Sequence, residues 1–290
     1  MPAKRTIPTP QEFLGCSTRE MIPGRAALIG CPLDLTSTYR TGSDTAPQAI
    51  RTASDSIETY SPFLDLDLGD VPFADIGDVP LHGETLENAL KKIRSALSEV
   101  LEAKARPLSL GGEHTITLPV VEALNTCNAD FVVVHADAHS DLREEYEGST
   151  INHATVIRRI SELVGPERLI QIGIRAGTRE EFTWMRENGT LLHWGPAAEK
   201  TLLARIGGRS VYLTLDLDVL DPACLHATGN PEPGGWFYPD LERLFSALAE
   251  ITLLAADIVE LNPTLDPSEA GTITAAKIVR EALLILGRSA

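Results

Sequence analysis

Short apolar segments alternate with amphipathic ones along almost the whole chain. Seven segments dominated by Val, Ile and Leu predict β-strands: Ala26–Gly30, Pro107–Leu110, Phe131–Ala136, Leu169–Ile174, Leu191–Trp194, Val211–Leu217 and Leu253–Leu261. Their apolar character is continuous rather than alternating, which is typical of strands buried on both faces of a parallel sheet.

Helical patterns lie between these strands. The clearest runs from Glu84 to Glu102, where apolar residues recur at steps of three and four and form one stripe. Further helices are predicted over Asp240–Glu250 and Thr272–Leu286. We therefore expect an α/β fold with a mostly parallel sheet of about eight strands between layers of helices. No linker or repeat divides residues 1–290, so we expect a single domain, with residues 1–25 as an N-terminal extension.

The charge of the chain narrows the range of partners. Asp and Glu number 41 against 25 Lys and Arg, a formal charge of −16, which disfavours binding to nucleic acid or anionic membrane surfaces. The four cysteines form no C-x-x-C pair, as is usual in a reducing compartment. Neither a signal peptide nor a run of ~18 apolar residues is found. We expect a cytoplasmic protein.

Acidic and histidine residues follow three of the predicted strands. Glu113-His114 comes after the second strand, Asp137-Ala-His139-Ser-Asp141 after the third, and Asp216-Leu-Asp218 at the end of the sixth. Parallel strands end at the same edge of a sheet, so these residues are expected to converge there. Residues two apart are also expected to project to the same side of an extended segment.

This convergence gathers four carboxylates and two imidazoles. Burying that much unpaired negative charge costs many kcal/mol, whereas divalent cations would neutralise it. A single Asp-x-Asp is usually only a strand-end feature, but three such motifs after three strands favour a metal site. Because no cysteine takes part, the ligands suit Mn²⁺ or Mg²⁺ better than structural zinc. Six ligands suit two metals that share carboxylates and convert a bridging water into hydroxide.

The same three motifs resemble the signature blocks of the ureohydrolase (arginase/agmatinase) superfamily. The similarity extends from Cys31-Pro-Leu-Asp34 to Asp257-Ile-Val-Glu260-Leu-Asn-Pro263. The resemblance implies a three-layer α/β/α fold around an eight-stranded parallel sheet and two Mn²⁺ per subunit. It also implies hydrolysis of a guanidinium group to urea and an amine, and a homo-oligomer, usually a trimer or hexamer.

The resemblance also implies a role for each site residue. One metal would be held by His114, Asp137, Asp141 and Asp216, and the other by His139, Asp137, Asp216 and Asp218. Catalytic roles fall to Asp141, which would relay a proton to the leaving amine, to His153 as a proton shuttle, and to Glu260, which would hold the guanidinium. His153 could instead be an ordinary helix-start residue. His135 could support a metal ligand or be a satisfied core histidine.

The substrate is predicted from departures within the superfamily. Arginase-like members carry an Asp at the position of Ala176, and they carry an Asn and a Ser in the segment that corresponds to Leu142–Gly148. This chain lacks these residues, and both of its segments resemble those of agmatinases. Glu144, Glu145 and Glu147 are expected to attract a small dicationic guanidino substrate. We therefore expect agmatine to be converted to urea and putrescine, a step of polyamine biosynthesis. Asn230 stands where the family usually has Thr, which leaves that loop's contacts open.

Alternatives remain open at this point. Another guanidino compound (guanidinobutyrate, guanidinopropionate or arginine) could be the substrate. A deacetylase-like hydrolase with a single zinc would need fewer ligands than the six present. A non-catalytic scaffold would not need the complete set of ligands together with His153 and Glu260.

Overall fold

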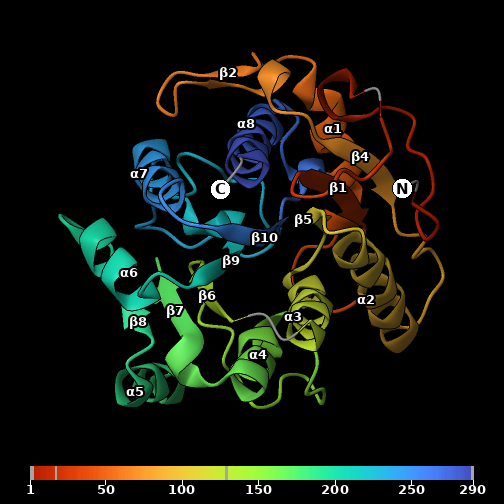
Figure 1. Ribbon diagram of the computed structural model, residues 1–290. Coiled ribbons are helices and arrows are strands. Elements are labelled where there is room, and N and C mark those ends of the chain that lie inside the picture. The colour runs from red at the N-terminus through yellow and green to blue at the C-terminus, as the bar shows by residue number, and fades with distance from the viewer. Residues whose placement is uncertain (1–2, 17, 128–129, 289–290) are drawn as a thin grey trace.

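The computed structural model describes residues 3–16, 18–127 and 130–288. Eight strands form a parallel sheet in the order β4-β1-β5-β10-β9-β6-β7-β8 (Figure 1). They are β1 (Ala26–Cys31), β4 (Ala74–Asp78), β5 (Arg106–Gly111), β6 (Phe131–Ala136), β7 (Leu169–Ile172), β8 (Leu191–Leu192), β9 (Ser210–Asp216) and β10 (Leu253–Val259). The predicted fold class is confirmed. A separate antiparallel pair joins β2 (Tyr60–Ser61) to β3 (Leu66–Asp67).

Two layers of helices cover the sheet. One face carries α1 (Ala46–Ser54), α6 (Ala198–Ile206), α7 (Tyr238–Leu248) and α8 (Ala270–Gly287). The opposite face carries α2 (Leu86–Glu102), α3 (Thr117–Thr126), α4 (Val156–Val164) and α5 (Arg179–Asn188). Short 3₁₀ helices lie in the connections: η1 (Phe13–Gly15), η2 (Ser43–Thr45), η3 (Leu68–Asp70), η4 (His114–Ile116), η5 (His153–Thr155), η6 (Pro166–Arg168), η7 (Leu217–Val219) and η8 (Pro263–Leu265).

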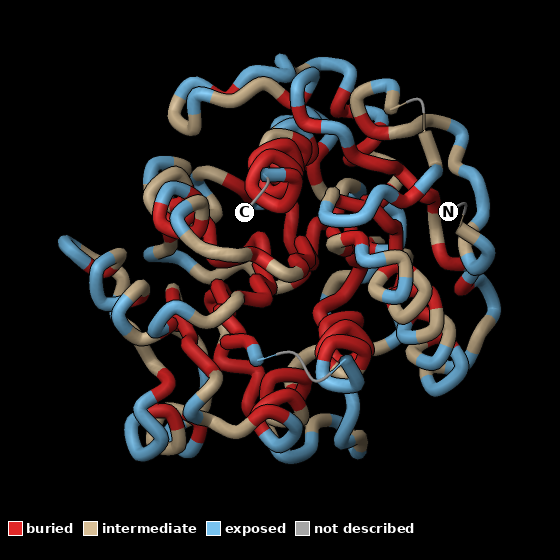
Figure 2. The backbone as a smooth tube through the Cα atoms, in the orientation of Figure 1, coloured by how far each residue is buried: buried red, intermediate tan, exposed pale blue. Residues whose placement is uncertain are grey.

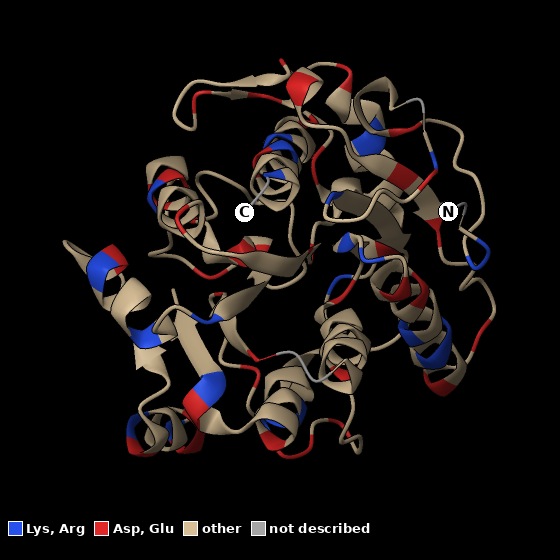
Figure 3. Cartoon of the chain, viewed as in Figure 1, with Lys and Arg blue, Asp and Glu red and all other residues tan. Residues whose placement is uncertain are grey.

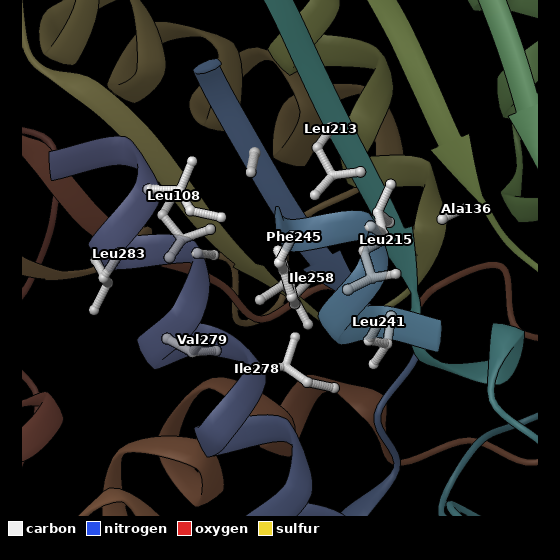
Figure 4. Close-up of a cluster of buried hydrophobic side chains, with 14 of the residues drawn as sticks. Leu108, Ala136, Leu213, Leu215, Leu241, Phe245, Ile258, Ile278, Val279 and Leu283 are labelled. Atoms are coloured by element: carbon white, nitrogen blue, oxygen red, sulfur yellow. The ribbon is translucent and has the colours of Figure 1, made fainter. Parts of the chain in front are cut away.

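The core follows from the apolar strands. Successive side chains of a strand point to opposite faces, so each central strand contributes to two apolar layers. Figure 4 shows Leu213, Leu215 and Ile258 of the sheet against Phe245 of α7 and Val279 of α8. In the tube view the central strands and α8 are largely buried, whereas exposed positions lie on outer loops and outward helix faces (Figure 2).

The predicted apolar stripe of α2 is confirmed. Ala89, Ile93, Ala96, Leu97 and Val100 are buried, and the helix begins after Thr85, whose hydroxyl accepts from the Asn88 N–H. Such a cap satisfies one of the free N–H groups of the first turn. Outer helices such as α2 and α5 carry charges of both signs (Figure 3).

The β4 edge was missed by the sequence analysis, because Asp75, Gly77 and Asp78 interrupt its apolar pattern. Both carboxylates are held by the buried Arg51: Nε lies 2.8 Å from Asp75 Oδ2 and Nη1 lies 2.7 Å from Asp78 Oδ1. This ion-pair network permits acids within a mostly buried strand.

Part of the expected N-terminal extension packs on β4. Ile7 makes an antiparallel bridge with Asp78, and the buried Phe13 donates its backbone N–H to Asp75 Oδ2 at 2.9 Å. Within the described ranges, no helix combines the length and the apolar character needed to cross a membrane.

Candidate metal centre

Four neighbouring strands bring the predicted site residues to one edge of the sheet. His114 follows β5, Glu260 follows β10, Asp216 ends β9, and Asp137 follows β6. Because β5, β10, β9 and β6 are adjacent in the sheet, residues up to 146 positions apart in sequence come together, as in the 2.7 Å hydrogen bond from the His114 N–H to Glu260 Oε1.

His114 faces three carboxylates at once. Its Nδ1 lies 3.2 Å from Asp137 Oδ2, 3.1 Å from Asp141 Oδ2 and 3.4 Å from Asp216 Oδ2, and none of these forms a proper hydrogen bond. The ring is oriented by Thr214, whose Oγ1 lies 2.9 Å from Nε2. A buried ring nitrogen aimed between three carboxylates is the arrangement expected of a metal ligand whose other nitrogen is fixed by a hydrogen bond.

His139 forms the second part of the cluster. Its Nδ1 lies 2.9 Å from Asp218 Oδ2 and 3.7 Å from Asp137 Oδ1, and its side chain is 30% exposed. Ligand atoms of Asp137, His139 and Asp218 lie within 4.8 Å of one another, as do those of His114, His135, Asp137 and Asp141. Asp137 therefore belongs to both groups and lies where a shared ligand is required.

The two acidic motifs reach this position through turns, so the expectation of extended segments is wrong. Asp216 Oδ1 accepts the Asp218 N–H at 2.8 Å and opens η7, and Asp137 Oδ1 accepts the His139 N–H at 2.5 Å. An Asp side chain that bonds to the backbone two residues later closes an Asx turn. Asp141 adopts a left-handed backbone with φ +51°. These turns, and not strand alternation, direct the carboxylates inward.

The electrostatics of the cluster are those of an uncompensated anionic site. Burial, and then the neighbouring carboxylates of Asp218 and Asp137, raise the pKa of Asp216 well above its usual value. Burial would also raise the pKa of Asp137, but the imidazoles of His135 and His114 hold it well below that range. Burial lowers the pKa of His139, yet the carboxylates of Asp218, Asp137 and Asp141 raise it to about 11. Without cations these side chains must be neutralised by protons, and a pair of divalent ions would do so instead.

Two buried groups support the ligands from behind. His135 Nε2 lies 2.7 Å from Asp137 Oδ2, and its Nδ1 lies 3.3 Å from Gln171 Nε2, so His135 both contacts a predicted ligand and is a satisfied core residue. Asp257 accepts hydrogen bonds from Thr214 at 2.7 Å and from the Tyr212 hydroxyl. Asp257 thereby holds the threonine that orients His114.

A cavity of about 510 Å³ opens over the cluster. Its lining includes the predicted site residues His139, Asp141, His153, Asp216, Asp218 and Glu260. Burial raises the pKa of Glu260 to about 8, although the His114 N–H lowers it. His153 both lines this cavity and begins η5, so the two interpretations of this residue are compatible.

The acidic segment expected to attract the substrate lies outside the cavity. Glu144, Glu145 and Glu147 do not line it, and Glu144 pairs with Arg158 at 2.8 Å over a neighbouring depression. Arg143 lines the cavity instead, with its guanidinium carbon 4.4 Å from the ring centroid of Tyr146. The three glutamates therefore lie outside the cavity lining, and their expected attraction for a cationic substrate, which acts over a distance, stays a prediction.

Other outer residues come from three loops. Ala176 and Asn230, two of the three departures from the family pattern, both line the cavity, together with Thr38, Tyr39 and Glu232. The sequence analysis missed Thr38 and Tyr39, although they follow β1 at the same edge of the sheet. The available signal was their position after a predicted strand, but neither Thr38 nor Tyr39 is an acid or a histidine.

Comparisons with known proteins agree with this geometry. The sequence model of the Arginase family matches residues 24–285. Agmatinase of Bacillus subtilis (strain 168) is 41% identical over 263 residues, which are 89% of this chain and 91% of that protein. Guanidinobutyrase of Pseudomonas aeruginosa is 34% identical over 278 residues, 90% of this chain and 86% of that protein. Among solved structures, proclavaminate amidino hydrolase from Streptomyces clavuligerus has a TM-score of 0.89 at 28% identity and covers 99% of this chain and 100% of that one.

Proposed function

The chain belongs to the arginase family and is a hydrolase of guanidino compounds, and on this premise we propose that it converts agmatine to urea and putrescine with two Mn²⁺ per subunit. The most direct support is the position of His114 Nδ1, which lies within 3.4 Å of an oxygen of each of three carboxylates. Two of those carboxylates, Asp141 and Asp216, line the same cavity as Glu260. The 41% identity to an agmatinase favours agmatine over other guanidines.

The ligands divide into two sets that share members. His114, Asp137, Asp141 and Asp216 would hold one ion, and His139, Asp137, Asp216 and Asp218 would hold the other. Oxygen and imidazole ligands without cysteine suit Mn²⁺. Two ions bound there would supply a water molecule of lowered pKa and positive charge to balance the negative charge that develops around the guanidinium carbon.

Glu260 orients the substrate. Its Oε1 already accepts the His114 N–H, so the carboxylate is fixed relative to the metal ligands. A carboxylate pairs with a planar guanidinium through two parallel hydrogen bonds, which fixes the carbon that is attacked. The raised pKa of Glu260 marks the cost of its burial, and a bound guanidinium relieves that cost.

Asp141 and His153 move protons. Asp141 Oδ2 lies 3.1 Å from His114 Nδ1, at the floor of the cavity, and relays a proton to the departing amine. His153 lies farther out in the same wall and exchanges protons between the site and solvent.

A second candidate substrate is 4-guanidinobutyrate, and Arg143 is the observation that favours it. Among the described residues, Arg143 has no carboxylate within 4.0 Å, so its charge is available to a distal carboxylate. Glu232 lines the same wall and offers the opposite charge to a distal ammonium. An agmatinase and a guanidinobutyrase are both similar to this chain.

A substrate panel tests the proposal. Urea release is measured with agmatine, 4-guanidinobutyrate, 3-guanidinopropionate and arginine. We expect the highest kcat/KM with agmatine, a loss of that preference in Glu232→Gln, and a smaller effect in Arg143→Gln. A clear preference for a carboxylate-bearing substrate that disappears in Arg143→Gln would contradict the choice of agmatine and support the second candidate.

The remaining expectations are part of the same proposal. We place the enzyme in the cytoplasm, in polyamine biosynthesis, and as a homo-oligomer of three or six chains. All four cysteines lie in the described ranges and are free, which supports a reducing compartment. Light scattering of the purified chain checks the oligomeric state.

A further inference from the structure

The loop after β1 contacts His153 through a single hydroxyl. Thr36 Oγ1 lies 3.1 Å from the backbone N of His153 and 3.3 Å from its Nδ1. The backbone N–H of His153 is free to make this contact because His153 is the first residue of η5, where no intrahelical acceptor exists. One oxygen atom therefore fixes both the backbone and the ring of this histidine.

Thr36 is itself held by the buried Glu113. Its hydroxyl lies 2.8 Å from Glu113 Oε1, and its N–H donates to Oε2 at 2.5 Å. The N–H of Leu35 donates to the same Oε2 at 2.8 Å. Gly112 permits this approach, since a Cβ at that position would lie 1.9 Å from the Leu33 carbonyl oxygen. Glu113 thus anchors the loop from the end of β5.

The protons on this chain of groups can be assigned. A carboxylate has no proton to give, so the Thr36 hydroxyl donates to Glu113, its shortest and only charged acceptor. Thr115 Oγ1, at 3.2 Å, is a more distant neutral neighbour. Once its proton is directed to Glu113, Thr36 Oγ1 can only accept from His153. Nδ1 must then carry a proton, which leaves Nε2 as the basic nitrogen of the neutral ring.

We infer that Thr36 is a positioning residue for His153: anchored by Glu113, it holds the imidazole in the Nδ1–H tautomer, so that Nε2 is the atom that takes up and releases the proton. The catalytic use of that atom rests on the proposed function, but the tautomer does not. No bond other than N–H changes in this step: Nε2 gains a proton from the site or from water and returns it.

The other neighbours of His153 do not compete for its nitrogens. The Tyr146 ring packs edge-to-face against the imidazole, with the ring centroids 6.0 Å apart, and the Arg143 guanidinium carbon lies over the Tyr146 ring, 4.4 Å from its centroid. Asn152 caps η5 by accepting the Ala154 N–H and donating to the Tyr146 carbonyl oxygen. Among the described residues, Thr36 is therefore the side chain that hydrogen-bonds to the ring.

The tautomer is measured by ¹⁵N NMR of the histidine-labelled full chain loaded with diamagnetic Mg²⁺ and without substrate. The signal of His153 is assigned by its loss in His153→Asn. We expect a protonated Nδ1 and an unprotonated Nε2 in the wild type and in Thr36→Ser, and a shift toward the Nε2–H tautomer in Thr36→Val. An Nε2–H tautomer in the wild type would overturn the inference without any need for a variant.

Steady-state kinetics of the Mn²⁺-loaded enzyme give the second readout. We expect Thr36→Val to lower kcat by roughly 10–100-fold with little change in KM, by analogy with partners that orient metal-ligating histidines, and Thr36→Ser to retain most activity. In the His153→Asn background, Thr36→Val should cost nothing further, because residues that act through one another are non-additive. An equal loss in both backgrounds would show that Thr36 acts elsewhere and overturn the inference. If no guanidino compound releases urea, the proposed function fails, and the NMR result still decides the tautomer.

Discussion

At the β4 edge of the sheet, Asp75 and Asp78 share the guanidinium of Arg51. Among the described residues, the four carboxylates at the carboxyl ends of β6 and β9 have imidazoles as their only side-chain partners that can carry a positive charge. Arg51 is buried and always charged, so the first cluster carries its own cation. The second cluster gathers Asp137, Asp141, Asp216 and Asp218 around histidines, which can lose their protons. The difference shows why one acidic cluster stabilises the fold and the other requires ions from solution.

The two clusters differ in what offsets burial, since burial raises the pKa of Asp78 even beside Arg51. Arg51 remains protonated because the carboxylates of Asp75 and Asp78 outweigh its burial and raise its pKa further. In the second cluster burial and like charges raise the pKa of Asp216 and Asp218. A group whose charged form is so disfavoured is stabilised by an added cation and not by its protein neighbours.

The largest expected effect comes from removing a ligand of the second cluster. His139→Ala should lower turnover by at least the roughly 10²–10³-fold that losing one electrostatic stabiliser costs in other enzymes, and should reduce the metal bound per chain. Urea release and elemental analysis measure the two effects. The matched control is His226→Ala, since His226 is 57% exposed and lies 3.6 Å from Asp266, outside the cluster. If His139→Ala kept wild-type turnover, the claim that the second cluster works by binding ions would be contradicted.

The second prediction compares how a substitution in each cluster changes the free energy of unfolding. Arg51→Leu should lower the free energy of unfolding by about 3–5 kcal/mol, because it leaves two carboxylates without their cation. Asp216→Asn in the metal-free chain should cost little, since it removes a disfavoured charge and keeps an oxygen for the Asp218 N–H. Denaturant unfolding measures both. A larger loss in Asp216→Asn than in Arg51→Leu would reverse the roles assigned to the two clusters.

The smallest effect is the response to pH. In the metal-free chain the pKa of His139 is raised to about 11, so a cation must displace a proton from it at neutral pH. The affinity for Mn²⁺ should therefore rise between about pH 6 and about pH 8, by up to about tenfold per pH unit for each proton released. The His139 contribution to metal-free stability has the opposite sign: it is complete below its ordinary pKa of 6.5 and is lost as the pH rises through about 11.

Calorimetric titration with Mn²⁺ in buffers of different ionisation heat counts the protons released. The Arg51 cluster gives no such signal, because Arg51 keeps its proton throughout this range. An affinity independent of pH, with no proton released, would contradict the account of His139.

The sequence predicts one of the two clusters and misses the other for a physical reason. Continuous apolar runs and the acids that follow them are local signals, so the ends of β5, β6 and β9 could be placed at one edge. Asp75 and Asp78 break the apolar pattern of β4, and their partner Arg51 lies on α1, so only the folded chain shows why they are tolerated.

The same limit applies to the outer wall of the site. The direction of Glu144 is set by Arg158 on α4, and that of Thr36 by Glu113 after β5. Neither contact can be predicted from the residues that are neighbours in the sequence. The convergence of the metal-site residues follows from topology, whereas the residues that select the substrate depend on how the loops pack.

The most direct test of the central claim is the number of metal ions per chain. The purified protein is saturated with Mn²⁺, freed of excess metal and analysed for manganese and protein in the same sample, beside the Asp218→Asn variant. The account predicts two ions per wild-type chain and fewer in the variant. A well-folded wild-type chain that binds none, or a variant that binds as many as the wild type, would contradict it.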